Sequence, residues 1–202
     1  MGELNVLVNN AGFHSRGPVA DVSAESLAKM IDVNLRAPIY LSRLAIPYLL
    51  ESSKPAAIIN VASLAGRSPI PGAATYSASK FGLRTFTFAL GEELRNTNIK
   101  LAVVSPGPID TGFIMSNIDE VADITFSQKM STDSEVADAI VAACSSGVRE
   151  LCMPTSGAFL TTINYLFPAV GRAVRPLLER KGAKIKARLK AEMPVASDAE
   201  EQ

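Results

Sequence analysis

Tyr76 and Lys80 are the two residues whose types and spacing most directly suggest chemistry. They lie four residues apart on a predicted helix, so their side chains share one face. A tyrosine at its ordinary pKa of about 10 is a poor acid–base catalyst at neutral pH, and a nearby ammonium group lowers that pKa. The pair could therefore work as a general acid and base. The same spacing also occurs on solvated helix faces that carry no chemistry.

Two further polar residues accompany this pair. Ser63 follows a predicted strand, thirteen residues before Tyr76, and its hydroxyl could hydrogen-bond a substrate carbonyl. Asn34 lies inside a predicted helix, where a short amide side chain is mildly unfavourable unless it has a polar task. The single histidine, His14, follows the Asn9-Asn10-Ala11-Gly12 turn, and a lone histidine in a loop is more often solvated than functional.

The elements that must position these residues alternate between short β-rich runs and helical patterns. This alternation is typical of a parallel sheet covered by helices. We expect strands at 5–9, 57–62, 101–104 and 150–153. We expect helices at 25–51, where Pro38 restarts or bends the helix, at 75–96 and at 132–144, where Thr132 and Glu135 fit a capping box. The predicted fold class is therefore α/β, with one doubly wound parallel sheet.

Polar clusters follow three of these strands, at 9–12, at Ser63 and at 105–111. In doubly wound sheets, ligands bind outside the carboxyl ends of the strands. We therefore expect a functional site at that edge.

Composition limits the classes of protein that fit. The chain has 202 residues, 48% of them hydrophobic, and equal numbers of basic and acidic side chains, 20 of each. A disordered chain is excluded and a globally basic nucleic-acid binder is disfavoured. Two cysteines are too few for a disulfide scaffold, one histidine excludes a histidine-rich metal site, and no apolar run is long enough to span a bilayer. With no secretory leader, we expect a cytoplasmic location.

Taken together, the motifs resemble those of the short-chain dehydrogenase/reductase superfamily. The matching segments occur in the family's order over about residues 3–155. They are Asn9-Asn10-Ala11-Gly12, Asn34 in Val33-Asn34-Leu35, Ser63, Tyr76-Ser-Ala-Ser-Lys80, and Ser105-Pro106-Gly107-Pro108-Ile109-Asp110-Thr111. The resemblance implies a Rossmann-like catalytic domain at 1–155, followed at 156–202 by an apolar and basic helical extension with a disordered end.

The resemblance also implies an NAD(P)-dependent oxidoreductase that acts on a small-molecule carbonyl or secondary alcohol. Tyr76 would be the general acid or base, and Lys80 would lower its pKa and hold the nicotinamide ribose. Ser63 would orient the substrate carbonyl, and Asn34 would anchor a proton-relaying water. Further cofactor contacts would come from Asn10, from the backbone of Ile109 and from the Thr111 hydroxyl. Nothing in the sequence separates NAD from NADP.

The family's N-terminal strand, its Gly-rich turn and a second βαβ pass have no counterpart here, a difference of roughly 60–80 residues. We expect this absence to leave the first strand with an apolar edge. The first methionine could be internal to a longer enzyme. The alternative is a non-catalytic fragment or pseudoenzyme that acts as an interaction protein. A sugar-nucleotide epimerase or dehydratase also uses Ser, Tyr and Lys, but the short Ser63–Tyr76 spacing and Asn34 fit it less well.

The C-terminal part has a charge pattern of its own. Residues 172–192 carry eight basic and two acidic side chains, a net charge of +6. Leu178, Ile185 and Leu189 share one helical face, and the preceding residues, 158–171, are apolar. A basic amphipathic helix of this kind can lie on an anionic membrane surface. We therefore expect a solvated helix packed on the domain or on a partner subunit, with peripheral membrane contact through 158–192 as the alternative. By resemblance to the family, we also expect a homo-oligomer.

Overall fold

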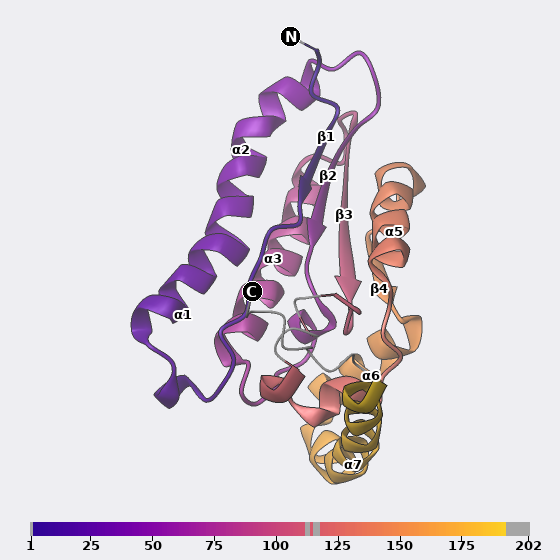
Figure 1. The fold of residues 1–202 in the computed structure, drawn as a ribbon. Coiled ribbons are helices and arrows are strands. Elements are labelled where there is room, and N and C mark those ends of the chain that lie inside the picture. Colours follow the sequence, from indigo (N-terminus) through magenta and orange to yellow (C-terminus); the bar gives the residue numbers. More distant parts are fainter. Residues whose placement is uncertain (1, 112–113, 115–117, 193–202) are drawn as a thin grey trace, which may run out of the picture.

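A four-stranded parallel sheet forms the centre of the protein in a computed structural model, which describes residues 2–111, 114 and 118–192 (Figure 1). The strands lie in the order β1-β2-β3-β4. Their bounds are Val6–Asn9 for β1, Ala56–Val61 for β2, Ile99–Pro106 for β3 and Glu150–Met153 for β4. All three pairings are parallel, as the alternating pattern predicts.

Helices cover both faces of this sheet, which confirms the doubly wound α/β fold (Figure 1). The chain passes from β1 to β2 through α1 (Ala24–Ile31) and α2 (Ala37–Leu50), and from β2 to β3 through α3 (Ala74–Glu93). It passes from β3 to β4 through α5 (Asp133–Ser146). The first group of helices packs on one face and α5 packs on the other.

Strand β2 shows why the sheet needs both layers, since all six of its residues are buried. Ile58 packs with Leu49 of α2 and Leu90 of α3, whereas Ile59 packs on the opposite face with Val136 of α5. Successive side chains of a strand point to opposite faces, so a continuous apolar run requires cover on both sides.

Local signals in the sequence set the ends of the helices. The predicted capping box is present: the Thr132 hydroxyl accepts from the Glu135 backbone N–H, and the Glu135 carboxylate accepts from the Thr132 N–H. The long helix predicted around Pro38 is divided by one π-helical turn, Asp32–Arg36, and Pro38 lies in the first turn of α2. Proline is tolerated there because the first helical N–H groups have no partner within the helix.

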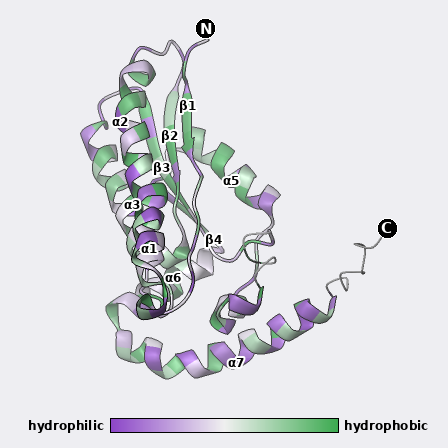
Figure 2. Ribbon diagram, turned by 60° about the vertical axis from the view of Figure 1, so that its left-hand side comes forward, coloured by the Kyte–Doolittle hydropathy of each residue, from purple (hydrophilic) through white to green (hydrophobic). Residues whose placement is uncertain are grey.

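The C-terminal extension forms two helices, α6 (Thr155–Leu166) and α7 (Pro168–Glu192). Both views place α7 beyond the carboxyl ends of the strands, and hydrophilic and hydrophobic residues alternate along it (Figure 2). No helix within the described ranges is long and apolar enough to cross a membrane. The predicted disordered end, 193–202, lies outside the described residues.

One face of α7 packs on the rest of the chain. Gly182 lies so close to the short 3₁₀ helix Asp123–Ser127 that a Cβ would collide with the carbonyl oxygen of Asp123. Beside it, Ile185 and Leu189 pack against a buried cluster of Ile114, Ile118, Val121 and Phe126. Part of the apolar helix face that the sequence suggested for membrane contact therefore packs against the rest of the protein.

Strand β1 is the outer strand on the side of the sheet away from β4, and it pairs only with β2 among the described strands. Its Val6 and Val8 are 40% and 39% exposed. The apolar edge predicted for this strand is therefore present.

Candidate active site

The structure brings the predicted site residues to one edge of the sheet. Asn10 follows β1, Ser63 follows β2, and Ile109 and Thr111 follow β3. Because the strands are parallel, these positions all lie at the carboxyl edge. Tyr76 and Lys80 occupy the first two turns of α3, and Asn34 lies in the π-helical turn before α2.

Ser63 lies close enough to Tyr76 for its side chain to affect the pKa of the phenol. The Ser63 hydroxyl donates to the Pro106 carbonyl oxygen at 3.3 Å and accepts from the Ala65 N–H at 3.1 Å, so it caps the short helix Leu64–Gly66. Gly66 packs directly on α3, where a Cβ would lie 2.7 Å from the Lys80 carbonyl carbon. Only glycine permits this approach, which holds the Ser63 turn against the helix that carries Tyr76.

The Tyr76 phenol is protonated at neutral pH in this environment. Burial raises its pKa above the ordinary value, while the neighbouring Ser63 hydroxyl and the positive charge of Arg16 act in the opposite direction. The desolvation effect is the largest of the three, because an apolar surrounding disfavours the phenolate.

His14 stacks on the Tyr76 ring, with 4.3 Å between the ring centroids and 18° between the planes. Burial, and secondarily the nearby charge of Arg16, lower the pKa of His14 to about 4, so the imidazole is neutral at physiological pH. Its Nε2 atom is buried and has no hydrogen-bond partner within the part of the chain that the structure describes. The expectation of a solvated loop histidine is therefore wrong. Only the position of His14 after the turn that ends β1 could have suggested otherwise.

Lys80 is buried beside these residues, and its Nζ donates to the Val61 carbonyl oxygen at 2.8 Å. Burial lowers its pKa to about 8. The resemblance implies that Lys80 lowers the pKa of Tyr76. Ser63 and Arg16 act on that pKa in the same direction.

Asn34 binds the backbone of the turn that follows β1. Its Oδ1 accepts from the Phe13 N–H at 3.0 Å, and its Nδ2 donates to the Phe13 carbonyl oxygen at 2.9 Å. Gly12 passes so close that a Cβ would lie 3.0 Å from Asn34 Oδ1 and 3.3 Å from Lys80 Nζ. Asn34, whose amide is unfavourable within a helix, therefore fixes the segment that carries His14.

The other predicted cofactor contacts lie at the same edge without contacting Tyr76 or Lys80 in the interactions that the structure describes. Asn10 is exposed and Thr111 is half-buried. Ile109 forms a short parallel bridge with Ser131, and the Asp110 N–H donates to the Ser131 carbonyl oxygen at 2.9 Å. This bridge fixes the backbone just after β3.

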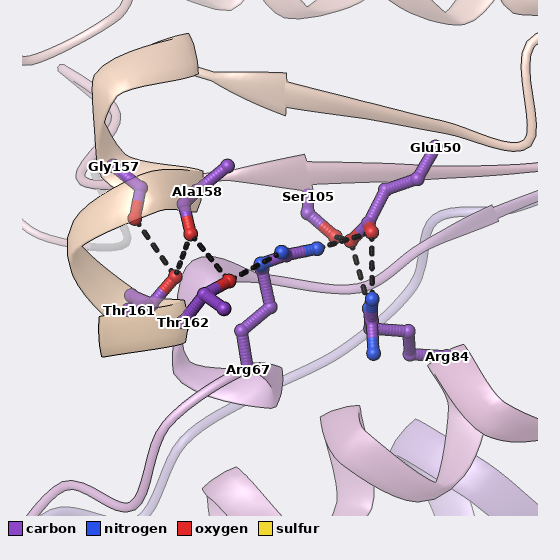
Figure 3. A network of polar contacts seen from close by, with 8 residues as sticks. All are labelled: Arg67, Arg84, Ser105, Glu150, Gly157, Ala158, Thr161 and Thr162. Atoms are coloured by element: carbon purple, nitrogen blue, oxygen red, sulfur yellow. Dashed lines mark hydrogen bonds and ion pairs between the residues drawn. The ribbon is translucent and has the colours of Figure 1, made fainter. Parts of the chain in front are cut away.

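A buried charge network, absent from the sequence-based predictions, links the elements around the site (Figure 3). The Glu150 carboxylate accepts from Arg67, from Ser105 at 2.8 Å and from Arg84 at 2.9 Å. Arg67 also donates to Thr162 of α6 at 3.0 Å. Hydrogen bonds from these arginines and Ser105 outweigh burial and lower the pKa of Glu150 to about 2. The network joins β4, β3, α3 and α6 to the Ser63 turn, and its members are too far apart in sequence to form a motif.

The arrangement fits the ribose and nicotinamide end of a dinucleotide. This edge carries the buried ammonium of Lys80, the protonated phenol of Tyr76 and the Ser63 hydroxyl, and a Cβ on Gly12 would lie 3.3 Å from Lys80 Nζ. Such a set can donate hydrogen bonds to sugar hydroxyls and to a carbonyl oxygen. Among the described residues, no Gly-rich turn lies between a strand and a helix in the manner that holds a pyrophosphate.

Comparison with known proteins supports the same assignment. Residues 1–122 match the family model for short chain dehydrogenases. The chain is 32% identical over 173 residues to a ketoacyl reductase, HetN, of a Nostoc species, which covers 85% of this chain and 58% of that protein. It is 33% identical over 142 residues to an uncharacterized oxidoreductase of Staphylococcus epidermidis, covering 70% of this chain and 59% of that protein.

A solved structure shares the fold as well. A 4-hydroxyisoleucine dehydrogenase complexed with NADH superposes with a TM-score of 0.65 at 30% identity, over 73% of this chain and 65% of that one. The chain therefore spans less than two thirds of the length of each of these proteins.

Proposed function

This chain belongs to the short-chain dehydrogenase family, and from that premise we propose that it is the catalytic part of an NAD(P)-dependent oxidoreductase. The reaction interconverts a carbonyl compound and a secondary alcohol. The observation that carries this proposal is that Ser63, Tyr76 and the buried Lys80 come together at the carboxyl edge of a parallel sheet.

A nicotinamide cofactor, when bound, supplies the hydride in reduction and accepts it in oxidation. The Tyr76 hydroxyl donates a proton to the carbonyl oxygen in reduction and takes one from the alcohol in oxidation. A raised pKa keeps this phenol protonated at neutral pH, which is the form required for reduction. The Ser63 hydroxyl, on the same side, donates a hydrogen bond to the substrate oxygen and orients it.

The remaining site residues position these two. Lys80, together with Tyr76, would hold the ribose hydroxyls of the cofactor, and Asn34 fixes the Phe13 backbone beside them. Asn10, Ile109 and Thr111 would contact the cofactor farther along the edge. The comparison structure contains NADH, which supports the dinucleotide assignment, and NADP remains an equal alternative.

Replacing Tyr76 with phenylalanine tests the proposal directly. Turnover with a panel of small aldehydes and ketones should fall by about 10²–10⁴-fold, because the proton donor is lost while ring packing remains. Tyr165→Phe is the matched control, since Tyr165 is an exposed tyrosine on α6. Equal turnover in the two variants would contradict the assigned role.

Binding of NADH and NADPH is measured separately on the unmodified chain. The sequence contains no tryptophan, so the fluorescence of the reduced cofactor can be followed with little protein background. Saturable binding supports an oxidoreductase. A folded chain that binds neither cofactor supports the alternative of a non-catalytic interaction protein.

We also propose that the protein self-associates. Helix α2 exposes Tyr40, Leu44 and Tyr48, which are four residues apart and share one face. Light scattering on the eluting protein should give at least twice the mass of the 202-residue chain. A mass of 21.4 kDa at micromolar concentration would contradict self-association.

A further inference from the structure

The outer side of the C-terminal helix pair exposes large apolar side chains that no described segment covers. Leu166, Phe167 and Val170 surround the turn between α6 and α7, and they are 61%, 58% and 48% exposed. Phe159 extends this surface along α6 and Leu177 extends it along α7. A group of exposed apolar side chains on adjacent helices marks a contact site more often than a scatter of single residues does.

Helix α7 continues this surface with basic side chains. The helical repeat places Val170, Leu177 and Lys184 on one face, opposite Gly182 and Leu189, which pack inward. Arg180 and Lys181 lie beside this row and are exposed. Within the described ranges, Arg180, Lys181 and Lys184 form no ion pair.

Most other charged residues of α7 form ion pairs. Lys186 pairs with Asp123 at 3.2 Å, and Lys190 pairs with Asp119. Both acidic residues of the helix are also used, Glu179 by Arg175 and Glu192 by Arg188. Arg180, Lys181 and Lys184 therefore face outward, and neither acidic residue of the helix pairs with them.

We propose that this α6–α7 outer face is a peripheral binding surface for membranes that contain anionic lipids. Its apolar part would enter the boundary between headgroups and acyl chains, and its basic part would contact lipid phosphates. The residues of this proposed surface are not Ile185 and Leu189, the apolar row that the sequence pattern suggested, because those two side chains pack inward. Helix α7 lies at the end of the molecule beyond the carboxyl ends of the strands (Figures 1 and 2). Tyr76, in the first turn of α3, lies at the same edge of the sheet.

Charge argues for a lipid surface over a second copy of the chain. A twofold contact through the same face would bring the Arg180, Lys181 and Lys184 groups of two molecules toward one another, without acidic partners on that face. Such a like-charge arrangement disfavours a symmetric interface. Anionic headgroups complement the same charges.

Sedimentation of the full chain with vesicles tests the proposal. One vesicle is phosphatidylcholine alone, and the other contains about one third phosphatidylglycerol. We expect binding to the second vesicle only, and weaker binding as salt is added. Replacing Arg180, Lys181 and Lys184 together with glutamine should reduce binding by about a hundredfold, since each cation near the surface contributes about 1 kcal/mol.

Two control variants distinguish the effect of this surface from the effect of removing exposed charge or apolar area elsewhere. Arg43, Lys54 and Arg95 are exposed elsewhere, and their triple replacement with glutamine should leave vesicle binding within twofold (about 0.4 kcal/mol). Leu177→Gln should weaken binding about tenfold, whereas Val141→Gln, at an exposed position of α5, should not.

Several outcomes would overturn the proposal. They are failure of the folded chain to sediment with anionic vesicles at low salt, equal loss of binding in the two charge triples, and a Leu177→Gln variant whose only defect is a reduced oligomer mass. Sedimentation does not require turnover, so these outcomes are distinguishable from a failure of the proposed oxidoreductase function.

Discussion

The carboxyl edge of the sheet and helix α7 both carry many charged groups, but they hold them in opposite ways. At the edge, Glu150 has a side chain only 11% exposed and is bound by two arginines and a serine. On α7, half of the basic side chains pair with single acids near the surface, and Arg180, Lys181 and Lys184 extend outward. Buried charge is costly unless fully paired, whereas exposed charge costs little and contributes little to stability.

The difference indicates which part of the chain depends on charge for its fold. Loss of one partner in the buried network leaves other charges without compensation, so its effect should spread through β3, β4, α3 and α6. Loss of one cation from the outer face of α7 should change binding without changing the fold. Four substitutions compare the two regions, in order of decreasing expected effect. Two of them remove a charge, and two disturb a close backbone contact.

Glu150→Gln should destabilise the protein most, by about 3 kcal/mol, because Arg67 and Arg84 lose their shared carboxylate. Chemical denaturation measures this, with the exposed Glu93→Gln as control. The pKa of Glu150 is lowered from 4.5 to about 2, so its stabilising effect is complete above about pH 4.5 and is lost as the pH falls toward 2. The variant should lack that part of the acid dependence, and an unchanged acid profile would contradict the role assigned to the network.

Gly66→Ala should destabilise by about 1–3 kcal/mol, since its Cβ would lie 2.7 Å from the backbone of Lys80. It should also reduce turnover, because the Ser63 turn would be displaced from Tyr76. Gly91→Ala is the matched control: its Cβ would make an ordinary 3.7 Å contact with Leu101, and alanine favours the helix. Equal stability of the two variants would show that the close approach at Gly66 is not required.

Gly182→Ala should have a smaller and more local effect. The new Cβ would collide with the Asp123 carbonyl, so α7 should detach while the sheet stays folded. Limited proteolysis should then cleave within 168–192 faster, with little change in the unfolding midpoint of the remainder. Ala187→Gly, at an exposed position of α7, lowers helix propensity by about 1 kcal/mol without touching the docking contact. Equally fast cleavage of that variant would attribute the effect to helix propensity.

Lys184→Gln should change stability least, by no more than about 0.5 kcal/mol, because the side chain is exposed and forms no ion pair within the part of the chain that the structure describes. Thermal unfolding at low and high salt measures this. A change as large as that of Glu150→Gln would remove the contrast between the two regions.

Local sequence signals predicted most of the fold. The strand at Glu150–Met153 and the Thr132 capping box occur where they were expected, because both depend on residues close together in the chain. The restart of the helix near Pro38 was also predicted, since proline restricts its own turn. Of the candidate site, the spacing of Tyr76 and Lys80 and the position of Ser63 after a strand could be predicted, because helix period and strand order fix them.

What the sequence could not provide depended on contacts between distant segments. His14 and Tyr76 are 62 positions apart, and their stacking depends on Asn34 holding the Phe13 backbone. Arg67 and Glu150 are 83 positions apart. The pattern of α7 showed an amphipathic helix but left open which face packs inward.

By itself, then, the sequence determined the element types, the parallel α/β order and the residues available for acid–base chemistry, since these follow from backbone propensity, hydrophobic period and residue type. The tertiary structure alone decided that Lys80 donates to Val61, that His14 is half-buried and neutral, and that Arg180, Lys181 and Lys184 face outward. Burial and charge pairing are properties of the packed chain, because solvent exclusion depends on segments that meet only after folding.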